Sequence, residues 1–212
     1  MKFVVIYLGG QGPAMAPTLD GEIVATIAAD SGLLLADAHG AKVDLVVGDM
    51  DSVDAGLLAK YENEGTIISR FPHEKNETDF ELAVMAAMNY VADELVVLGG
   101  GGGRTDHLIS NLAILSGIKT EKWKTQMHTN KETIFICRPG QVKNIDSNFD
   151  NIVSLVPMSR SVSGVKTQNL KWELKDETLE FQNARGMSNV CLGNSFSVKI
   201  DTGTLAIFCP ST

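Results

Sequence analysis

The chain has 212 residues, of which 44% are hydrophobic and 21% are charged. This composition is typical of a globular protein with one large or two small domains, and it excludes a disordered chain, a collagen and a coiled coil. The formal net charge of -8 argues against nucleic acid or an anionic membrane as the main partner. Three cysteines without a CxxC pair predict no disulfide framework and favour a reducing compartment. No apolar run approaches the roughly 18 residues that span a bilayer.

Residues 1–125 have the pattern of alternating strands and helices. Nearly continuous apolar runs predict strands at 3–8, 23–28, 44–47, 66–69 and 94–98. Helical patterns lie between them, at 32–39, 53–62, 78–91 and 105–115. This alternation predicts a mostly parallel sheet with helices on both faces. The first run has only six residues, too few for the apolar core of a signal peptide, so we expect a buried strand and a cytoplasmic protein.

Residues 126–212 change to an all-β pattern. Short runs rich in Val, Ile, Thr and Phe predict strands at 151–157, 164–174, 178–181, 195–200 and 204–208. The chain is therefore expected to be an α/β domain over 1–125 followed by a β-sandwich domain over 126–212. The acidity belongs to the first part, which holds 18 acidic and 9 basic residues, against 8 and 9 in the second. A phosphorylated substrate would need metal ions to be tolerated in so acidic a domain.

Polar loops follow four of the predicted strands. In open parallel sheets ligands bind beyond the carboxyl ends of the strands, so these loops should lie at one edge. The candidate side chains in them are Asp30, Asp49, Asp51, Lys75, Thr78, Asp79, Arg104 and Asp106.

The pair Asp49 and Asp51 suits Mg²⁺, which prefers oxygen ligands and is usually held by one or two carboxylates with substrate phosphates. The alternative is that Asp51 or Ser52 caps the next helix, which is the better interpretation of an isolated DxD. Here Asp30, Asp79 and Asp106 are predicted at the same edge. Because several uncompensated carboxylates would repel one another, the set favours a metal site.

The glycine run 99–103 leads into a predicted helix, an arrangement that can cradle phosphate oxygens. A flexible surface loop is the alternative, but Arg104 favours phosphate because its guanidinium pairs with phosphate through two hydrogen bonds. Asp106 is either part of the site or a first-turn acid stabilised by the helix dipole. Lys75 could neutralise phosphate charge, although a single loop lysine is usually solvated. Thr78 and Asp79 could equally well serve the N-terminus of their helix, and the histidines suggest no metal cluster.

Taken together, these segments resemble the thiamine pyrophosphokinase family. The resemblance covers about residues 22–208, and the order of the motifs is specific although each is weak alone. The matching segments are 28–32, 43–52, 74–79 and 102–107 in the first part, and 164–166 and 186–189 in the second.

The resemblance implies that diphosphate passes from ATP to the hydroxyethyl oxygen of thiamine, which gives thiamine diphosphate and AMP. It implies a catalytic domain that binds ATP and Mg²⁺, a thiamine-binding and dimerisation domain, and a homodimer with shared sites. The implied catalytic residues are Asp49, Asp51, Asp79, Asp106 and Arg104, with the first three as metal ligands. The implied substrate-binding residues are Asp30, Lys75, Thr78, Gly102, Gly103, Arg104, Ser188 and Asn189.

Two features depart from the family. Val190 and Cys191 follow Ser188-Asn189 where bacterial relatives often have an acid and an aromatic residue, and no tryptophan follows Trp172 to stack on thiamine. Two alternative functions remain at this point: another Mg-dependent nucleotide transferase that uses a DxD motif, or a non-catalytic thiamine or nucleotide sensor.

Overall fold

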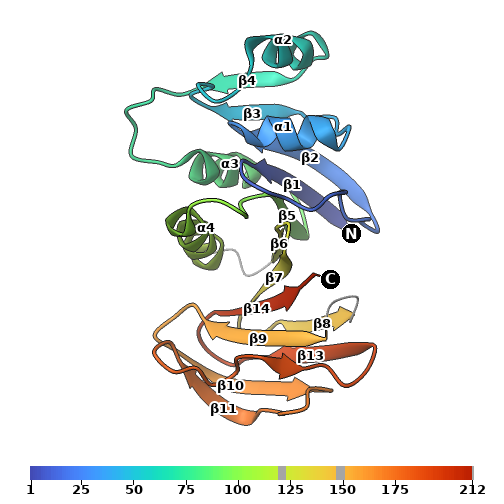
Figure 1. Ribbon diagram of the computed structural model, residues 1–212, viewed down its shortest axis with the longest axis vertical. Helices are drawn as coiled ribbons and strands as arrows, with labels where there is room; N and C mark the ends of the chain where they lie inside the picture. Colours follow the sequence, from blue (N-terminus) through green and yellow to red (C-terminus); the bar gives the residue numbers. More distant parts are fainter. Residues whose placement is uncertain (119–122, 147–150, 212) are drawn as a thin grey trace. The chain divides into compact units, whose positions relative to one another are not determined.

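The computed structural model describes residues 1–118, 123–146 and 151–211, and the chain forms two compact units (Figure 1). The first unit contains residues 1–111 and 127–130, and the second contains 112–126 and 131–212. The division between them therefore falls within helix α4 (Thr105–Gly117) and within strand β6 (Lys124–His128). Among the described residues, no helix has the length and apolar character needed to cross a membrane.

Five parallel strands of a larger sheet form the centre of the first unit, in the order β5-β1-β2-β3-β4. The strands are β1 (Lys2–Leu8), β2 (Glu22–Ala29), β3 (Leu45–Gly48), β4 (Ile67–Arg70) and β5 (Glu94–Leu98). The helices α1 (Gly32–Ala38), α2 (Ala55–Asn63) and α3 (Asp79–Ala87) follow β2, β3 and β4 in the chain. This confirms the predicted alternation and the mostly parallel sheet.

Both faces of this sheet are covered, which explains the continuous apolar runs. Val5 and Tyr7 of β1 belong to a core cluster with Leu33 of α1 and Leu58 of α2. The alternate residues of β1 are also buried, and α3 packs against β1, β2 and β3. A strand buried on both faces has no polar side to show in its sequence.

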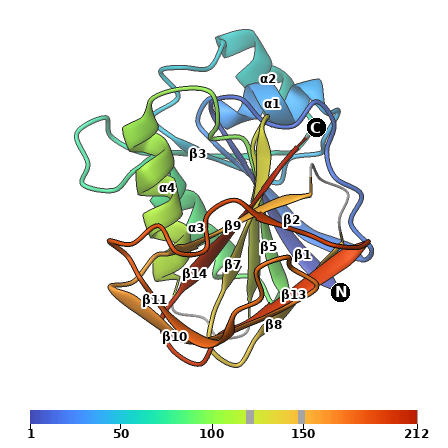
Figure 2. The ribbon, with the colours of Figure 1, turned by 60° about the horizontal axis from the view of Figure 1, so that its bottom comes forward.

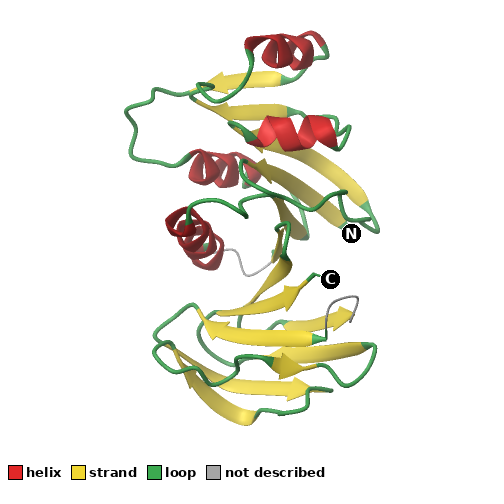
Figure 3. Cartoon of the chain, in the orientation of Figure 1, coloured by secondary structure: helices red, strands yellow, loops and turns green. Residues whose placement is uncertain are grey.

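The second unit is an antiparallel sandwich, in which one sheet has the order β12-β9-β14-β7 and the other β11-β10-β13-β8. The first contains β7 (Glu132–Cys137), β9 (Ile152–Pro157), β12 (Asn189–Val190) and β14 (Leu205–Pro210). The second contains β8 (Val142–Asp146), β10 (Ser161–Gln168), β11 (Lys175–Glu180) and β13 (Ser195–Lys199). Figure 2 shows these strands from a second direction, and Figure 3 separates strands from helices.

One hydrophobic core joins the two sheets of the sandwich. Leu155 and Leu205 come from the first sheet, and Val165, Phe196 and Val198 come from the second. Along β13 the buried and less buried residues alternate, as expected for a strand with one face on a core. The predicted β-sandwich is confirmed.

The prediction differed from the structure at several element ends. Strands β6, β7 and β8 are not expected from the sequence, and the run predicted as one strand at 164–174 ends as β10 at Gln168. Asn169 then takes a left-handed backbone conformation (φ 61°), which turns the chain out of the strand. The third helix, expected over 78–91, ends at Ala87.

The N-terminus of α2 tests the capping interpretation of the DxD segment. The side chain of Asp54 accepts hydrogen bonds from the backbone N–H groups of Gly56 (2.9 Å) and Leu57 (3.1 Å). Asp54 is therefore the N-cap residue, and the alternative that Asp51 or Ser52 caps this helix is wrong. The two residues remain free of that structural role.

We predict that Asp54→Ala lowers the free energy of unfolding by about 1 kcal/mol, because two backbone N–H groups lose their side-chain acceptor. Urea unfolding followed by circular dichroism measures the change. Glu62→Ala, an exposed change on the same helix, is the control and should alter stability much less. Equal stability of the Asp54→Ala variant and the wild type would show that the cap contributes nothing.

Candidate active site

A pocket of about 560 Å³ lies at the carboxyl edge of the parallel sheet, within the first unit. Its lining comes from the loops that follow β1, β2, β3, β4 and β5, which confirms that these loops meet at one edge. The candidate residues that line it are Asp30, Asp49, Asp51, Lys75, Thr78, Asp79, Gly103 and Arg104.

Gly48, the last residue of β3, allows two carboxylates to approach each other. Its φ is 145°, and a Cβ there would lie 3.0 Å from Cβ of Asp30 and 3.2 Å from Oδ1 of Asp79. Asp30 and Met50 also have positive φ values, of 44° and 62°. Such left-handed conformations are uncommon for residues other than glycine, and they cluster at functional sites.

Three carboxylates meet at this point. Asp30, Asp49 and Asp79 each offer an oxygen, and these oxygens lie within 4.8 Å of one another. Asp30 is only 8% exposed, and its buried Oδ1 has no hydrogen-bond partner among the described residues. Burial raises the pKa of Asp30, and the negative charges of Asp79 and Asp49 add to that rise. A buried, unpartnered carboxylate oxygen beside two other carboxylates fits a divalent cation.

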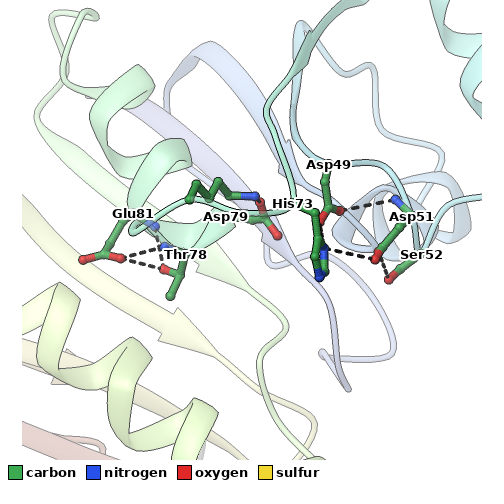
Figure 4. Close-up of polar contacts among 8 residues, drawn as sticks. Asp49, Asp51, Ser52, His73, Thr78, Asp79 and Glu81 are labelled. Atoms are coloured by element: carbon green, nitrogen blue, oxygen red, sulfur yellow. Dashed lines mark hydrogen bonds and ion pairs between the residues drawn. The ribbon is translucent and has the colours of Figure 1, made fainter.

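Lys75 and Thr78 are fixed by α3, which Asp79 begins. Lys75 Nζ lies 2.8 Å from Oδ1 of Asp79, and the lysine side chain is only 12% exposed. Burial lowers the pKa of Lys75, but the contact with the Asp79 carboxylate and the negative charges of Asp79, Asp49 and Asp30 together outweigh burial, so the pKa is raised. The hydroxyl of Thr78 accepts a hydrogen bond from the backbone N–H of Glu81 (3.1 Å), as part of a capping box at the start of α3 (Figure 4).

His73 lies beside the DxD segment (Figure 4). Its Nδ1 is 2.7 Å from Oδ2 of Asp49 and 3.7 Å from Oδ2 of Asp51. This hydrogen bond lowers the pKa of Asp49 and raises the pKa of His73. The sequence suggested no metal cluster among the histidines, but Asp49, Asp51 and His73 each offer a ligand atom, and these atoms lie within 4.8 Å of one another. The available signal was the position of His73 in the loop of Lys75, which the parallel topology directs to the same edge.

The glycine run is packed against the N-terminal loop, which argues against a free surface loop. Gln11 and Gly101 exchange two backbone hydrogen bonds (2.7 and 3.0 Å). Gly102 has a φ of 67°, and a Cβ there would overlap the side chain of Gln11. Gly103 lines the pocket and Gly102 does not.

Arg104 and Asp106 form an exposed ion pair at the start of α4. Arg104 Nη2 lies 2.6 Å from Oδ2 of Asp106, and its Nε donates to Oδ1 at 3.1 Å. Arg104 lines the pocket, but Asp106 does not, and it lies in the first turn of the helix. Of the two interpretations of Asp106, this geometry favours the first-turn acid, which also orients Arg104.

Ser188 and Asn189 lie in the second unit. Asn189 is 3% exposed, and its side chain accepts a hydrogen bond from Trp172 N (3.1 Å) and donates one to Trp172 O (2.8 Å). Ser188 is exposed and has a φ of 52°. Asn189 thus holds the turn that carries Trp172, whose side chain is 49% exposed.

Two family models match the chain. The thiamin pyrophosphokinase catalytic domain matches residues 21–127, and the thiamin pyrophosphokinase vitamin B1 binding domain matches residues 141–205. The chain is 27% identical to thiamine pyrophosphokinase from Bacillus subtilis over 181 residues, which cover 83% of both chains. It is 24% identical to thiamine pyrophosphokinase 1 from Arabidopsis thaliana, with 77% of this chain and 64% of the relative covered.

Solved structures have the same fold. The crystal structure of the Bacillus subtilis thiamine pyrophosphokinase covers 100% of both chains with a TM-score of 0.84 at 21% identity. The thiamin pyrophosphokinase from Candida albicans covers 99% of this chain and 90% of its own, with a TM-score of 0.77 at 18% identity. The two family models together cover most of the chain, and the chain therefore belongs to the thiamin pyrophosphokinase family.

Proposed function

We propose that this chain transfers a diphosphate group from ATP to the hydroxyethyl oxygen of thiamine, with the acidic pocket of the first unit as the place where the diphosphate is held. The observation that supports this assignment best is the buried Oδ1 of Asp30, which lacks a partner among the described residues and lies in the group formed with Asp49 and Asp79. The alternatives, a different nucleotide transferase or a sensor, do not account for a catalytic and a vitamin B1 binding match in one chain.

Mg²⁺ is the proposed cofactor. Asp30, Asp49 and Asp79 are placed to hold it, with Asp51 beside Asp49. When bound, the ion would neutralise charge on the diphosphate of ATP, which the carboxylates would otherwise repel. This set contains two of the three expected ligands, Asp49 and Asp79, and adds Asp30, the buried member of the group.

Residues of this chain would position the phosphate groups of ATP. Lys75 is held in the pocket by Asp79, and Arg104 lies at the pocket beside Asp106. Both cations suit phosphate oxygens, and the backbone of the glycine run can approach the same group. Diphosphoryl transfer depends mainly on such positioning and on charge stabilisation.

The second unit supplies the proposed thiamine-binding and dimerisation part, with Ser188 and Asn189 near the vitamin. The chain is expected to work in the cytoplasm, where Cys137, Cys191 and Cys209, all free and buried, would stay reduced. The catalytic part in this proposal covers residues 1–125, and the thiamine-binding part covers 126–212.

We predict that Asp49→Asn reduces kcat/KM by at least about 100-fold, or about 2.7 kcal/mol of transition-state stabilisation, because an amide is a poorer Mg²⁺ ligand. The assay incubates protein, Mg²⁺, ATP and thiamine, and measures AMP and thiamine diphosphate, which should appear in equal amounts. Asp20→Asn, an exposed change outside the pocket, is the control. Absence of both products with the wild type would contradict the proposed function, and near-normal turnover by Asp49→Asn would remove that residue from the site.

Arg104→Lys should weaken catalysis with ATP and leave thiamine binding little changed. Lysine keeps the positive charge but loses the planar guanidinium that pairs with phosphate through two hydrogen bonds. Steady-state kinetics with each substrate varied in turn, together with calorimetric binding of thiamine alone, measure the two effects. A variant with poor thiamine affinity and normal ATP kinetics would assign Arg104 to the other substrate.

A homodimer with shared sites is the proposed assembly, in which Ser188 and Asn189 of one subunit serve the acidic edge of its partner. A mixed dimer tests this: one subunit carries Asp49→Asn and the other carries Ser188→Trp, each inactive alone. Shared sites place both defects in one site and leave the other intact, so activity should partly return. If the mixture contains the mixed dimer and has no activity, the shared site is ruled out. Full activity of a monomer at assay concentration would rule it out as well.

A further inference from the structure

His73 lies in the loop between β4 and α3, and its ring faces the DxD segment (Figure 4). Its side chain is 80% exposed, so burial against a core does not explain its orientation. The contact that fixes it is polar: Nδ1 lies 2.7 Å from Oδ2 of Asp49, while the nearest oxygen of Asp51 is 3.7 Å away. His73 therefore hydrogen-bonds to Asp49 and lies farther from Asp51.

Asp49 is held through both of its carboxylate oxygens. Oδ2 is bonded to His73, and Oδ1 accepts the backbone N–H of Asp51 at 3.3 Å, which is a long hydrogen bond. The imidazole contact is the shorter, and it comes from a different loop. Removing it would leave Asp49 with only the weak local bond to set the orientation of its carboxylate.

Asp49 also belongs to the group with Asp30 and Asp79, so its orientation matters to any cation held there. Groups that hydrogen-bond to a ligating side chain set its orientation, and their loss typically reduces metal affinity about 10- to 100-fold. The position of Asp30 is set by its burial directly after β2, and the position of Asp79 is set by its place as the first residue of α3. Asp49 is thus the member of the group whose placement depends on a side-chain contact from another loop.

We propose that His73 is a positioning residue, which holds the carboxylate of Asp49 in the orientation that the divalent cation requires. This inference rests on the proposed function, since it concerns the same cation site. It assigns to His73 a part in cation affinity and none in the chemical step.

Three variants separate this role from a general structural one. His73→Ala removes the donor, whereas His73→Asn keeps an amide N–H close to the place of Nδ1. Asn76→Ala is the matched control, because Asn76 is exposed in the same loop and does not line the pocket. Thermal unfolding should be nearly the same for all three, since His73 is exposed.

The measurement is a Mn²⁺ titration followed by electron paramagnetic resonance, with and without a non-hydrolysable ATP analogue. We expect the dissociation constant for Mn²⁺ to rise about tenfold in His73→Ala and to stay within about threefold of wild type in His73→Asn. In turnover assays the Mg²⁺ concentration for half-maximal rate should rise likewise in His73→Ala, while kcat at saturating Mg²⁺ and the KM for thiamine stay near wild type.

The Asp49→Asn variant separates the positioning role of His73 from the existence of the cation site. If Asp49→Asn loses Mn²⁺ and His73→Ala binds it as the wild type does, the positioning role is wrong and the cation site stands. If the wild type takes up no Mn²⁺ beyond that held by the analogue, the proposed function fails and the inference fails with it. A fall in kcat for His73→Ala at saturating Mg²⁺ would overturn the positioning role in favour of a catalytic one.

Discussion

Three carboxylates that repel one another lie close together at the carboxyl edge of the parallel sheet, and the conformation of the surrounding loops depends on holding them there. Asp30, Asp49 and Asp79 bring oxygens within 4.8 Å of one another, and Asp30 does so while buried. Holding them together costs free energy, because like charges repel and burial removes water from them. The glycine at position 48, the capping box of α3 and the left-handed conformation of Asp30 all serve this close approach. Such an arrangement is what a divalent cation requires of its ligands.

The two cations at the pocket differ in how firmly they are held. Lys75 is largely buried and bonded to Asp79, so its charge is a fixed part of the acidic group. Arg104 is 73% exposed and bonded to Asp106, which is also exposed. Exposed ion pairs are weak, so a phosphate group could take Arg104 from Asp106 at little cost. The pocket thus combines a fixed cation with one that is free to rearrange.

The sequence predicted best those elements whose surroundings are uniform. Strand β5 was predicted at its observed bounds because all five of its residues are buried and the four that follow Glu94 are apolar. Strands β6 and β8 were missed because Lys124, Lys143 and Asp146 interrupt the apolar pattern, and neither strand has more than two buried apolar residues. A half-exposed strand gives only a weak hydrophobic pattern in the sequence, and whether it forms depends on its pairing with neighbouring strands.

The sequence predicted which loops form the site, but it did not predict the contacts between their side chains. Parallel topology directs the loops after β2, β3, β4 and β5 to one edge, so the acids and Lys75 could be grouped from the sequence. The hydrogen bond from His73 to Asp49 and the role of Asp54 as the cap depend on loop conformation, which short-range patterns do not determine. The pairing of Asp106 with Arg104 likewise follows from side-chain geometry at one helix end.

We propose Asp30, Asp49 and Asp79 as the cation site of a diphosphate-transferring enzyme. Anomalous diffraction from crystals grown with Mn²⁺ and a non-hydrolysable ATP analogue tests it most directly. We expect a Mn²⁺ ion within about 2.5 Å of oxygens from at least two of these three carboxylates and in contact with the analogue's phosphates. Mn²⁺ bound to the phosphates with no oxygen of the three carboxylates in that range would contradict it.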